Sequence, residues 1–431
     1  MKKLNLLLLL SLLASLMLFT ACEDDDDDVT TTVCPGDVCV TENITSDETW
    51  TSDNVYVLQN RVVVESGVTL TIEPGVIVKG EAGQGTNATA LIIARGATIM
   101  AEGTASEPII FTSVSDEIQP GQIESPNLDA SFNGLWGGLI ILGNAPISAD
   151  AQAVQIEGIP PADQNGLYGG TNADDNSGVI KYVSIRHGGT NIGEGNEING
   201  LTLGGVGRGT TIEYVEVVAN QDDGIECFGG TVNISNALVW FQGDDAYDMD
   251  QDYTGTIDNF IYIGGPDSDH GMEFDGPEGS QDNGGFTLTN GTLIGWNDEG
   301  TGGGEYIDFR DGVSCVVENC YFANFSESSD VELDNNSVAQ KWIDGDIEVR
   351  NLAFNVSHLS GGNMTIEDIW QEKVDEGEED DPTDDEMPLD AFGQRPIPAS
   401  VQVVSTPNFG ADASVFNGWS LGAVLGNLDN L

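Results

Sequence analysis

Basic residues are scarce in this sequence of 431 residues, which has 13 Lys plus Arg against 72 Asp plus Glu and a formal net charge of −59. Proteins that bind nucleic acid use positive charge to neutralise phosphates, so we expect no nucleic-acid partner. Histidine is equally rare, with three residues in all, and no Cys-x-x-Cys pair occurs. The sequence therefore gives no recognisable ligand set for zinc.

Long apolar runs are also lacking, apart from Leu6 to Leu18, which follows Lys2 and Lys3. This run is shorter than the roughly 20 residues that span a bilayer, and it has the proportions of a signal peptide. We therefore expect residues 1–21 to be a cleaved leader and no other segment to cross a membrane.

The leader ends in Leu18-Phe19-Thr20-Ala21-Cys22, which resembles the lipobox of bacterial lipoproteins, although Phe19 replaces a smaller aliphatic residue. The resemblance implies cleavage before Cys22 and lipidation of its sulfur. Six consecutive acids follow, and their position resembles the surface-export signal of Bacteroidetes-type lipoproteins; a solvated acidic tether is the alternative. These features predict a monomeric outer-membrane protein that faces the cell exterior and contacts the membrane only through its lipid anchor.

Six cysteines are present, and their placement agrees with export. Cys34 and Cys39 are close enough in the chain to close a small disulfide loop near the tether. Cys227, Cys315 and Cys320 lie among apolar residues, and because three is an odd number, at least one should be a buried thiol.

Apolar residues make up 39% of the chain, too many for wholesale disorder, and the 55 glycines follow no collagen period. One pattern, an aliphatic residue followed two positions later by Asn or Tyr, recurs at intervals of 22 to 32 residues. Such spacing indicates a solenoid of β coils, because helical repeats need longer apolar stretches of period 3.6. The repeats are Ile180-x-Tyr182, Ile212-x-Tyr214, Ile234-x-Asn236, Ile257-x-Asn259, Leu288-x-Asn290, Val317-x-Asn319 and Val349-x-Asn351.

Stacked coils would align the five asparagines of this pattern into a ladder of side-chain amides at the ~4.8 Å strand spacing. In this respect the segment from about Val62 to Phe354 resembles a right-handed parallel β-helix of the pectate-lyase-like kind. The whole chain also resembles β-helix surface lipoproteins of the Bacteroidetes type. The resemblance implies a fold more than an activity, because this fold hosts lyases, hydrolases, adhesins and tailspikes.

The predicted architecture is all-β, a single right-handed parallel β-helix with an acidic disordered insertion and a C-terminal cap. We expect the signal peptide at 1–21, an acidic tether with the disulfide loop at 22–50, and the β-helix at 51–365. The insertion is placed at 366–395 because ten acids lie between Glu372 and Glu386. The cap is placed at 396–431, since the end of a solenoid needs a cover.

A second strand is expected in each coil, with its middle residue pointing outward by period-two alternation. These middle residues form a file that we name the acidic column: Glu226, Asp248, Glu273, Asp308 and Glu332. Two positions further along each strand lies the second column: Phe228, Asp250, Asp275, Arg310 and Asp334. Asp223 and Asp245 lie on the turns that lead into two of these strands.

Like charges about 5 Å apart repel by roughly 0.8 kcal/mol in water and by about 3 kcal/mol at an effective dielectric of ~20. The columns should therefore have raised carboxylate pKa values or bound cations. Ca²⁺ accepts oxygen ligands in flexible numbers, so calcium is the expected cofactor; the alternative is a solvated acidic face. The expected ligand pool is Asp223, Glu226, Asp245, Asp248, Asp250, Glu273 and Asp275.

Catalysis is left uncertain by the sequence. Pectate-lyase-like enzymes hold uronates through Ca²⁺ and use a Lys or Arg base, and the related polygalacturonases use several aspartates with a His. Asp223, Asp245 and His270 match these patterns loosely, and the Arg-x-Lys element is missing. A lyase base would have to be Lys181, Arg186, Arg208 or Arg310, none of which lies in a recognised motif. We therefore expect a surface lipoprotein that presents a rigid calcium-binding β-helix for glycan binding or adhesion. The alternative is a calcium-dependent polysaccharide lyase or glycoside hydrolase that acts on an acidic polysaccharide.

Overall fold

The computed structural model describes residues 34–191, 198–297, 304–359, 364–373, 388–406 and 409–431. The chain divides into two units, Met1–Val33 and Cys34–Leu431, and every described residue belongs to the second. The expected signal peptide, Cys22 and the first part of the tether therefore lie outside the described residues, as does 374–387 of the expected insertion. None of the helices in the described part is long and apolar enough to span a membrane.

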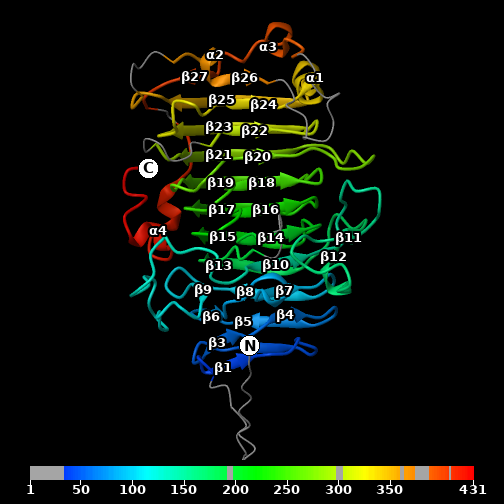
Figure 1. Ribbon diagram of the computed structural model, residues 1–431, viewed down its shortest axis with the longest axis vertical. Helices are drawn as coiled ribbons and strands as arrows, with labels where there is room; N and C mark the ends of the chain where they lie inside the picture. The colour runs from blue at the N-terminus through cyan, green and yellow to red at the C-terminus, as the bar shows by residue number, and fades with distance from the viewer. Residues whose placement is uncertain (1–33, 192–197, 298–303, 360–363, 374–387, 407–408) are drawn as a thin grey trace, which may run out of the picture. The chain divides into compact units, whose positions relative to one another are not determined.

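Parallel strands dominate the second unit and stack coil upon coil into two long sheets (Figure 1). Within the described residues the first sheet has 15 strands: β1 (Val38–Val40), β2 (Glu48–Trp50), β3 (Val55–Leu58), β5 (Thr69–Ile72), β6 (Ile77–Gly80), β8 (Thr98–Glu102), β9 (Ile109–Ser113), β13 (Gly178–Arg186), β15 (Thr211–Val218), β17 (Asn233–Trp240), β19 (Thr256–Ile263), β21 (Phe286–Ile294), β23 (Cys315–Ala323), β25 (Ile347–Asn355) and β27 (Val401–Val403). The second sheet has ten: β4 (Arg61–Val64), β7 (Ala90–Ile93), β10 (Leu139–Leu142), β14 (Leu201–Gly204), β16 (Ile225–Phe228), β18 (Tyr247–Asp250), β20 (Glu273–Phe274), β22 (Ile307–Phe309), β24 (Val331–Leu333) and β26 (Trp370–Glu372).

The remaining elements lie on the connections between these strands. A short antiparallel pair belongs to the loop that follows β10: β11 (Val154–Gln155) and β12 (Leu167–Tyr168). The α-helices are α1 (Asn336–Asp344), α2 (Ile366–Ile369), α3 (Ala391–Gln394) and α4 (Leu421–Val424). The 3₁₀ turns are η1 (Gly85–Asn87), η2 (Gln164–Gly166) and η3 (Ala413–Phe416).

One continuous apolar core runs through the coils, from Val40 in the first strand to Val401 in the last. Alternate residues of each strand enter this core, which is the arrangement that period-two patterning produces. Consecutive coils pair in parallel throughout both long sheets, as in the pairing of β15 with β17. The all-β parallel β-helix that the sequence predicts is confirmed.

The repeated Asn or Tyr occupies a corner of each coil. All seven residues have a left-handed backbone, with φ between 50° and 59°. At Tyr182 this corner divides β13 into two parts, so that β8 pairs with residues before it and β9 with residues after it. Asparagine tolerates the left-handed region better than most residues do, so the backbone requirement of the corner explains the repeat.

The asparagine ladder forms with one interruption. Side-chain amides donate from Asn259 to Asn236 (2.7 Å), from Asn319 to Asn290 (3.3 Å) and from Asn351 to Asn319 (2.9 Å). Asn290 instead donates to Asp258 (2.7 Å), because a carboxylate is the stronger acceptor. The stacked rings of Tyr182 and Tyr214, with centroids 4.4 Å apart, continue the file toward the N-terminus.

The expected domain boundaries differ from the structure on both sides of the β-helix. β1 and β2 lie within the expected tether yet pair with β3 and β5, and Cys34 and Cys39 form a disulfide beside them. β26 and β27 lie in the expected insertion and cap yet extend the two sheets. The reason is that Trp370 and Val401 both enter the core, although acidic residues surround Trp370 in the sequence.

The C-terminal residues cover the side of the first sheet rather than the end of the solenoid (Figure 1). Phe416 and Trp419 pack on an apolar patch of β15, β17 and β19. The end is covered by α1 and α3, whose Trp342 and Phe392 pack on Trp370 of β26. The cap expected at 396–431 is thus corrected to a lateral cover.

A buried carboxylate fixes this cover in place. Glu216 of β15 is fully buried and accepts hydrogen bonds from the Ser184 hydroxyl (2.6 Å) and the Trp240 indole (3.1 Å). It also accepts from the backbone N–H groups of Leu421 (2.9 Å) and Gly422 (2.7 Å). Four donors on one carboxylate compensate for its removal from water.

We predict that Glu216→Ala destabilises the protein by about 3 kcal/mol, because it leaves buried donors unsatisfied and releases the C-terminal cover. Thermal unfolding and hydrogen exchange of residues 409–431 measure both effects. Glu213→Ala is the control, since Glu213 lies on the same strand in a partly exposed pair with Lys181 (2.8 Å) and should cost less than about 1 kcal/mol. Equal losses from both variants would contradict the assignment.

Candidate functional site

The acidic column lies in strict register along the second sheet. Thr202 of β14 pairs with Glu226, which pairs with Asp248, and the file continues through Glu273 and Asp308 to Glu332. Each carboxylate therefore lies one strand spacing, about 4.8 Å, from the next. The second column follows the same register, with Phe228 opposite Asp250.

These carboxylates point away from the apolar core but are little exposed. Glu226 and Glu332 are 7% exposed, and Asp248 and Asp308 are 8% exposed. In-register stacking is the cause, because each side chain is covered by the neighbours one coil before and one coil after it. The side chains of the acidic column point outward, as expected. Because they are nearly buried, solvent screens their charges far less than it would on an exposed face.

Positive charge is distributed unevenly along the columns. From Glu273 toward the C-terminus, the carboxylates contact three cations: His270, Arg310 and Lys373. In the described part of the chain, no Lys, Arg or His lies within 4.0 Å of the carboxylates of Asp223, Glu226, Asp248 or Asp250. We name these four residues the uncompensated cluster.

Burial dominates the electrostatics of the uncompensated cluster. It raises the pKa values of Asp223, Glu226 and Asp248 well above those of ordinary carboxyls, and neighbouring carboxylates raise them further. Burial together with nearby Glu278 also raises the pKa of Asp250, to about 7. The raised pKa values favour the protonated forms of these carboxyl groups unless a bound cation compensates their charge.

Three members of this cluster have the geometry to share a cation. Carboxylate oxygens of Asp223, Glu226 and Asp248 lie within 4.8 Å of one another. The Oδ1 atom of Asp248 is buried and has no hydrogen-bond partner, and the Asn199 amide donates to Glu226 beside it. An all-oxygen set with an unused buried acceptor fits a hard cation such as Ca²⁺. A second group with similar spacing comprises Asp248, Glu273 and Asp275.

His270 joins two of the expected ligands. Its Nδ1 atom lies 2.8 Å from Asp245 Oδ1 and 3.0 Å from Glu273 Oε2. Burial acts to lower the pKa of His270, but hydrogen bonds to these two carboxylates outweigh it and raise the pKa to about 12. His270 is therefore an imidazolium at neutral pH, which makes it an ion-pair partner and not a general base.

The two carboxyl groups that contact His270 have widely different pKa values. Burial raises the pKa of Asp245 to about 7, against the hydrogen bond from His270. Burial also acts to raise the pKa of Glu273, but the His270 hydrogen bond and the Arg310 charge lower it to about 2. Glu273 is thus ionised at neutral pH, whereas Asp245 is close to half-protonated.

Arg310 and Lys373 compensate the C-terminal part of the columns. Arg310 contacts Glu273 directly and lies 3.8 Å from Asp275 and 3.9 Å from Asp308. Burial nevertheless raises the pKa of Asp275 to about 9 and that of Asp308 to about 8. Lys373 contacts Glu332 and lies 3.7 Å from Glu305 and 3.9 Å from Asp330.

Sequence reasoning did not identify Lys373, because it lies in the segment expected to be a disordered insertion. The apolar pair Ile369-Trp370, which ends three residues before Lys373, was the available signal for another strand. Of the catalytic candidates, the structure brings Asp245 and His270 into contact, and Asp223 accepts the backbone N–H of Asp245 (3.0 Å). Arg310 is connected to these residues through Glu273, which contacts both Arg310 and His270.

Comparison with known proteins gives one positive finding. A family model described as a pectate-lyase like beta helix domain matches residues 42–387, which is most of the chain. Neither the curated proteins nor the solved structures yield a match. The family match suggests a carbohydrate-related function.

We predict that the metal-free protein loses stability as the pH rises from about 5 to about 8. Asp245, Asp250 and Asp308 have folded pKa values of about 7, 7 and 8, above their unfolded values, so the folded state holds extra protons in this window. The stability present at low pH is lost as these protons leave, and His270 acts in the same direction above about pH 6.5.

The measurement is the melting temperature in a chelator across this pH range. Asp250→Asn should flatten the slope, whereas Asp267→Asn, at an exposed position, should leave it unchanged. A stability that increases with pH in this window would show that the columns do not hold protons as described.

Proposed function

The chain belongs to the pectate-lyase-like β-helix family, and on that basis we propose a cell-surface lipoprotein whose β-helix binds Ca²⁺ and presents a surface for glycan binding or adhesion. The single observation that carries the calcium assignment is the uncompensated cluster. Three of its buried carboxylates lie within reach of one ion and have no basic partner in the described residues.

Calcium suits this cluster for three physical reasons. The ligands are carboxylate oxygens, which a hard cation prefers. Burial, together with nearby carboxylates, raises the pKa values of Glu226 and Asp248, and one bound Ca²⁺ would supply positive charge that favours their ionised forms. The Asp248 Oδ1 atom, buried without a hydrogen bond, would gain a partner.

Attachment through Cys22 is supported by the leader and the lipobox-like sequence. The first strand, β1, begins at Val38, so only a short acidic segment separates Cys22 from the β-helix. A lipid on Cys22 would anchor the protein to the outer membrane without any spanning segment. The acidic segment and the Bacteroidetes-type export signal that it resembles favour display on the cell exterior.

An enzymatic alternative is favoured by one specific observation. Asp245 and Glu273 contact the same imidazolium, and their pKa values are separated to about 7 and about 2. Two carboxyl groups separated in this way can act as acid and base in a glycoside hydrolase. A lyase is supported less well, because ion pairs with Glu273 and its neighbours hold the pKa of Arg310 above its usual value and prevent it from acting as a base.

We predict that millimolar Ca²⁺ raises the melting temperature of the metal-stripped protein by several degrees and that Mg²⁺ has a much smaller effect. The double variant Glu226→Gln with Asp248→Asn should lose this response. The control Asp267→Asn with Glu327→Gln removes the same charge from exposed positions and should retain it. Equal responses from both double variants would refute the assignment of calcium to this cluster.

We predict that incubation with acidic polysaccharides yields neither new reducing ends nor unsaturated products. Chromatography of the products with a reducing-end assay and absorbance for unsaturated sugars measures both. New reducing ends that disappear in Asp245→Asn would instead establish the hydrolase. New unsaturated ends that require Ca²⁺ would establish the lyase.

A further inference from the structure

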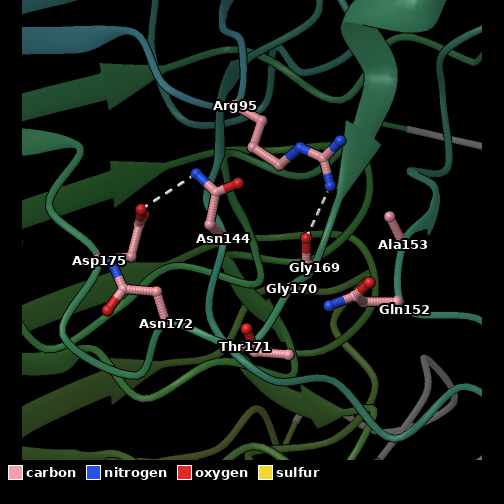
Figure 2. A pocket seen from close by; sticks show the side chains of 9 residues that line it. All are labelled: Arg95, Asn144, Gln152, Ala153, Gly169, Gly170, Thr171, Asn172 and Asp175. Atoms are coloured by element: carbon pink, nitrogen blue, oxygen red, sulfur yellow. Dashed lines mark hydrogen bonds between the residues drawn. The ribbon is translucent and has the colours of Figure 1, made fainter.

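The loop between β10 and β13 encloses two hollows that adjoin each other. The first has a volume of about 520 Å³ and is bounded by the turn after β7, the turn after β10 and the strand region around Gly169 (Figure 2). The second has a volume of about 420 Å³ and extends to the segment that contains Gln281 and Asn283. Both are lined by Gln152, Gly170 and Thr171, so they form one continuous groove, which we name the amide groove.

Close backbone packing shapes this groove. Gly169 has a left-handed backbone, with φ of +94°, and a Cβ atom on Gly170 would come within 2.4 Å of the Asn144 carbonyl oxygen. Glycine at both positions thus lets the loop pass tightly over the turn after β10. Across the groove, Ser280 donates its hydroxyl (2.7 Å) and its backbone N–H (3.1 Å) to Asp150, which holds the second hollow together.

The lining offers hydrogen-bonding groups suited to a sugar. Side-chain amides come from Asn144, Asn172 and Gln152 in the first hollow and from Gln281 and Asn283 in the second. An amide both donates and accepts, so it can bond a hydroxyl in either role. The carboxylate in the first hollow, Asp175, is 9% exposed and accepts from Asn144 (3.1 Å).

Arg95 is the basic residue of a lining that also contains the carboxylates of Asp175 and Asp150. Its Nη1 atom donates to the Gly169 carbonyl oxygen (2.8 Å), which holds the guanidinium at the first hollow, as Figure 2 shows. In the described residues no carboxylate lies within ion-pair distance of Arg95, although the chain contains 72 acids. Arg208, Arg310 and Arg350 each have a carboxylate partner, whereas Arg186 and Arg395, like Arg95, donate to backbone carbonyl groups.

A half-buried guanidinium without a carboxylate partner, in a protein of net charge −59, is placed to bind an external anion. Its planar fork matches a carboxylate or a sulfate, each of which accepts two parallel hydrogen bonds. The acidic column cannot serve this purpose, because its carboxylates repel anions unless metal is bound.

We propose that the amide groove binds a saccharide that carries an anionic group, with the anion on Arg95 and the sugar hydroxyls on the amides. This inference rests on the glycan-binding role proposed above and assigns it to a site separate from the acidic column. Binding in the amide groove requires no metal. The anion is the carboxylate of a uronic acid or a sulfate ester, and ligands of both kinds distinguish the two.

The test is calorimetric titration of the full chain with short oligosaccharides in the presence of EDTA. Three ligands of matched length are used: one with uronic acid, one with sulfate esters and one neutral. At least one acidic ligand should bind, and the neutral ligand should bind about tenfold more weakly. The acidic ligand that binds identifies the source of the anion.

Variants locate the site. Arg95→Gln should weaken binding of the acidic ligand about tenfold, whereas Arg350→Gln, which removes a surface guanidinium paired with Glu318 and Glu348, should not. Thr171→Trp fills the groove from an exposed position and should abolish binding while leaving the melting temperature unchanged. Together these two variants separate loss of the site from loss of the fold.

Three results would overturn the inference. The first is equal binding of neutral and acidic ligands with no effect of Arg95→Gln. The second is binding that requires Ca²⁺ and is lost only in Glu226→Gln with Asp248→Asn, which would move the glycan to the acidic column and leave the proposed function intact. The third is no binding of any ligand by a protein that still shows the calcium-dependent rise in melting temperature.

Discussion

In-register stacking of parallel strands is the constraint on which the rest of this structure depends. Each coil places its residues directly over those of the coil before it, so any residue type that recurs in the repeat becomes a file at the strand spacing. Asparagines at the corners benefit from this, because an amide can donate to one neighbour and accept from another. Carboxylates are destabilised by the same stacking, because it buries them and brings like charges together.

The chain compensates for this burial in two different ways along one sheet. Toward the C-terminus, His270, Arg310 and Lys373 supply positive charge from the protein itself. Toward the N-terminus, Asp223, Glu226 and Asp248 are left with protons or with an external cation. The protein therefore combines a region that its own cations partly neutralise with a region that has no such cations in the described residues. The amide groove lies apart from both regions and contains the Arg95 guanidinium, which has no carboxylate within ion-pair distance in the described residues.

The fold could be predicted because one repeat determines both the corner and the strand. Asn or Tyr at the left-handed corner fixes where each coil turns, and the register of Glu226, Asp248 and Glu273 follows from the same alignment. The ends of the solenoid could not be predicted as well, because β26 and β27 are short and because acidic residues surround the core residue Trp370 in the sequence. The ladder's break at Asn290 depends on the competing acceptor Asp258, which the repeat pattern does not reveal. Burial of the acidic column and the approach of Lys373 likewise required three-dimensional information.

The central claim is that the uncompensated cluster binds Ca²⁺, and a crystal structure of the protein grown with Ca²⁺ tests it most directly. The account predicts one ion between Glu226 and Asp248, with carboxylate oxygens at about 2.3–2.6 Å and an anomalous signal that identifies calcium. Well-resolved density with only water between these carboxylates, at millimolar Ca²⁺ and neutral pH, would contradict it. In that case protons alone would neutralise the buried carboxylates.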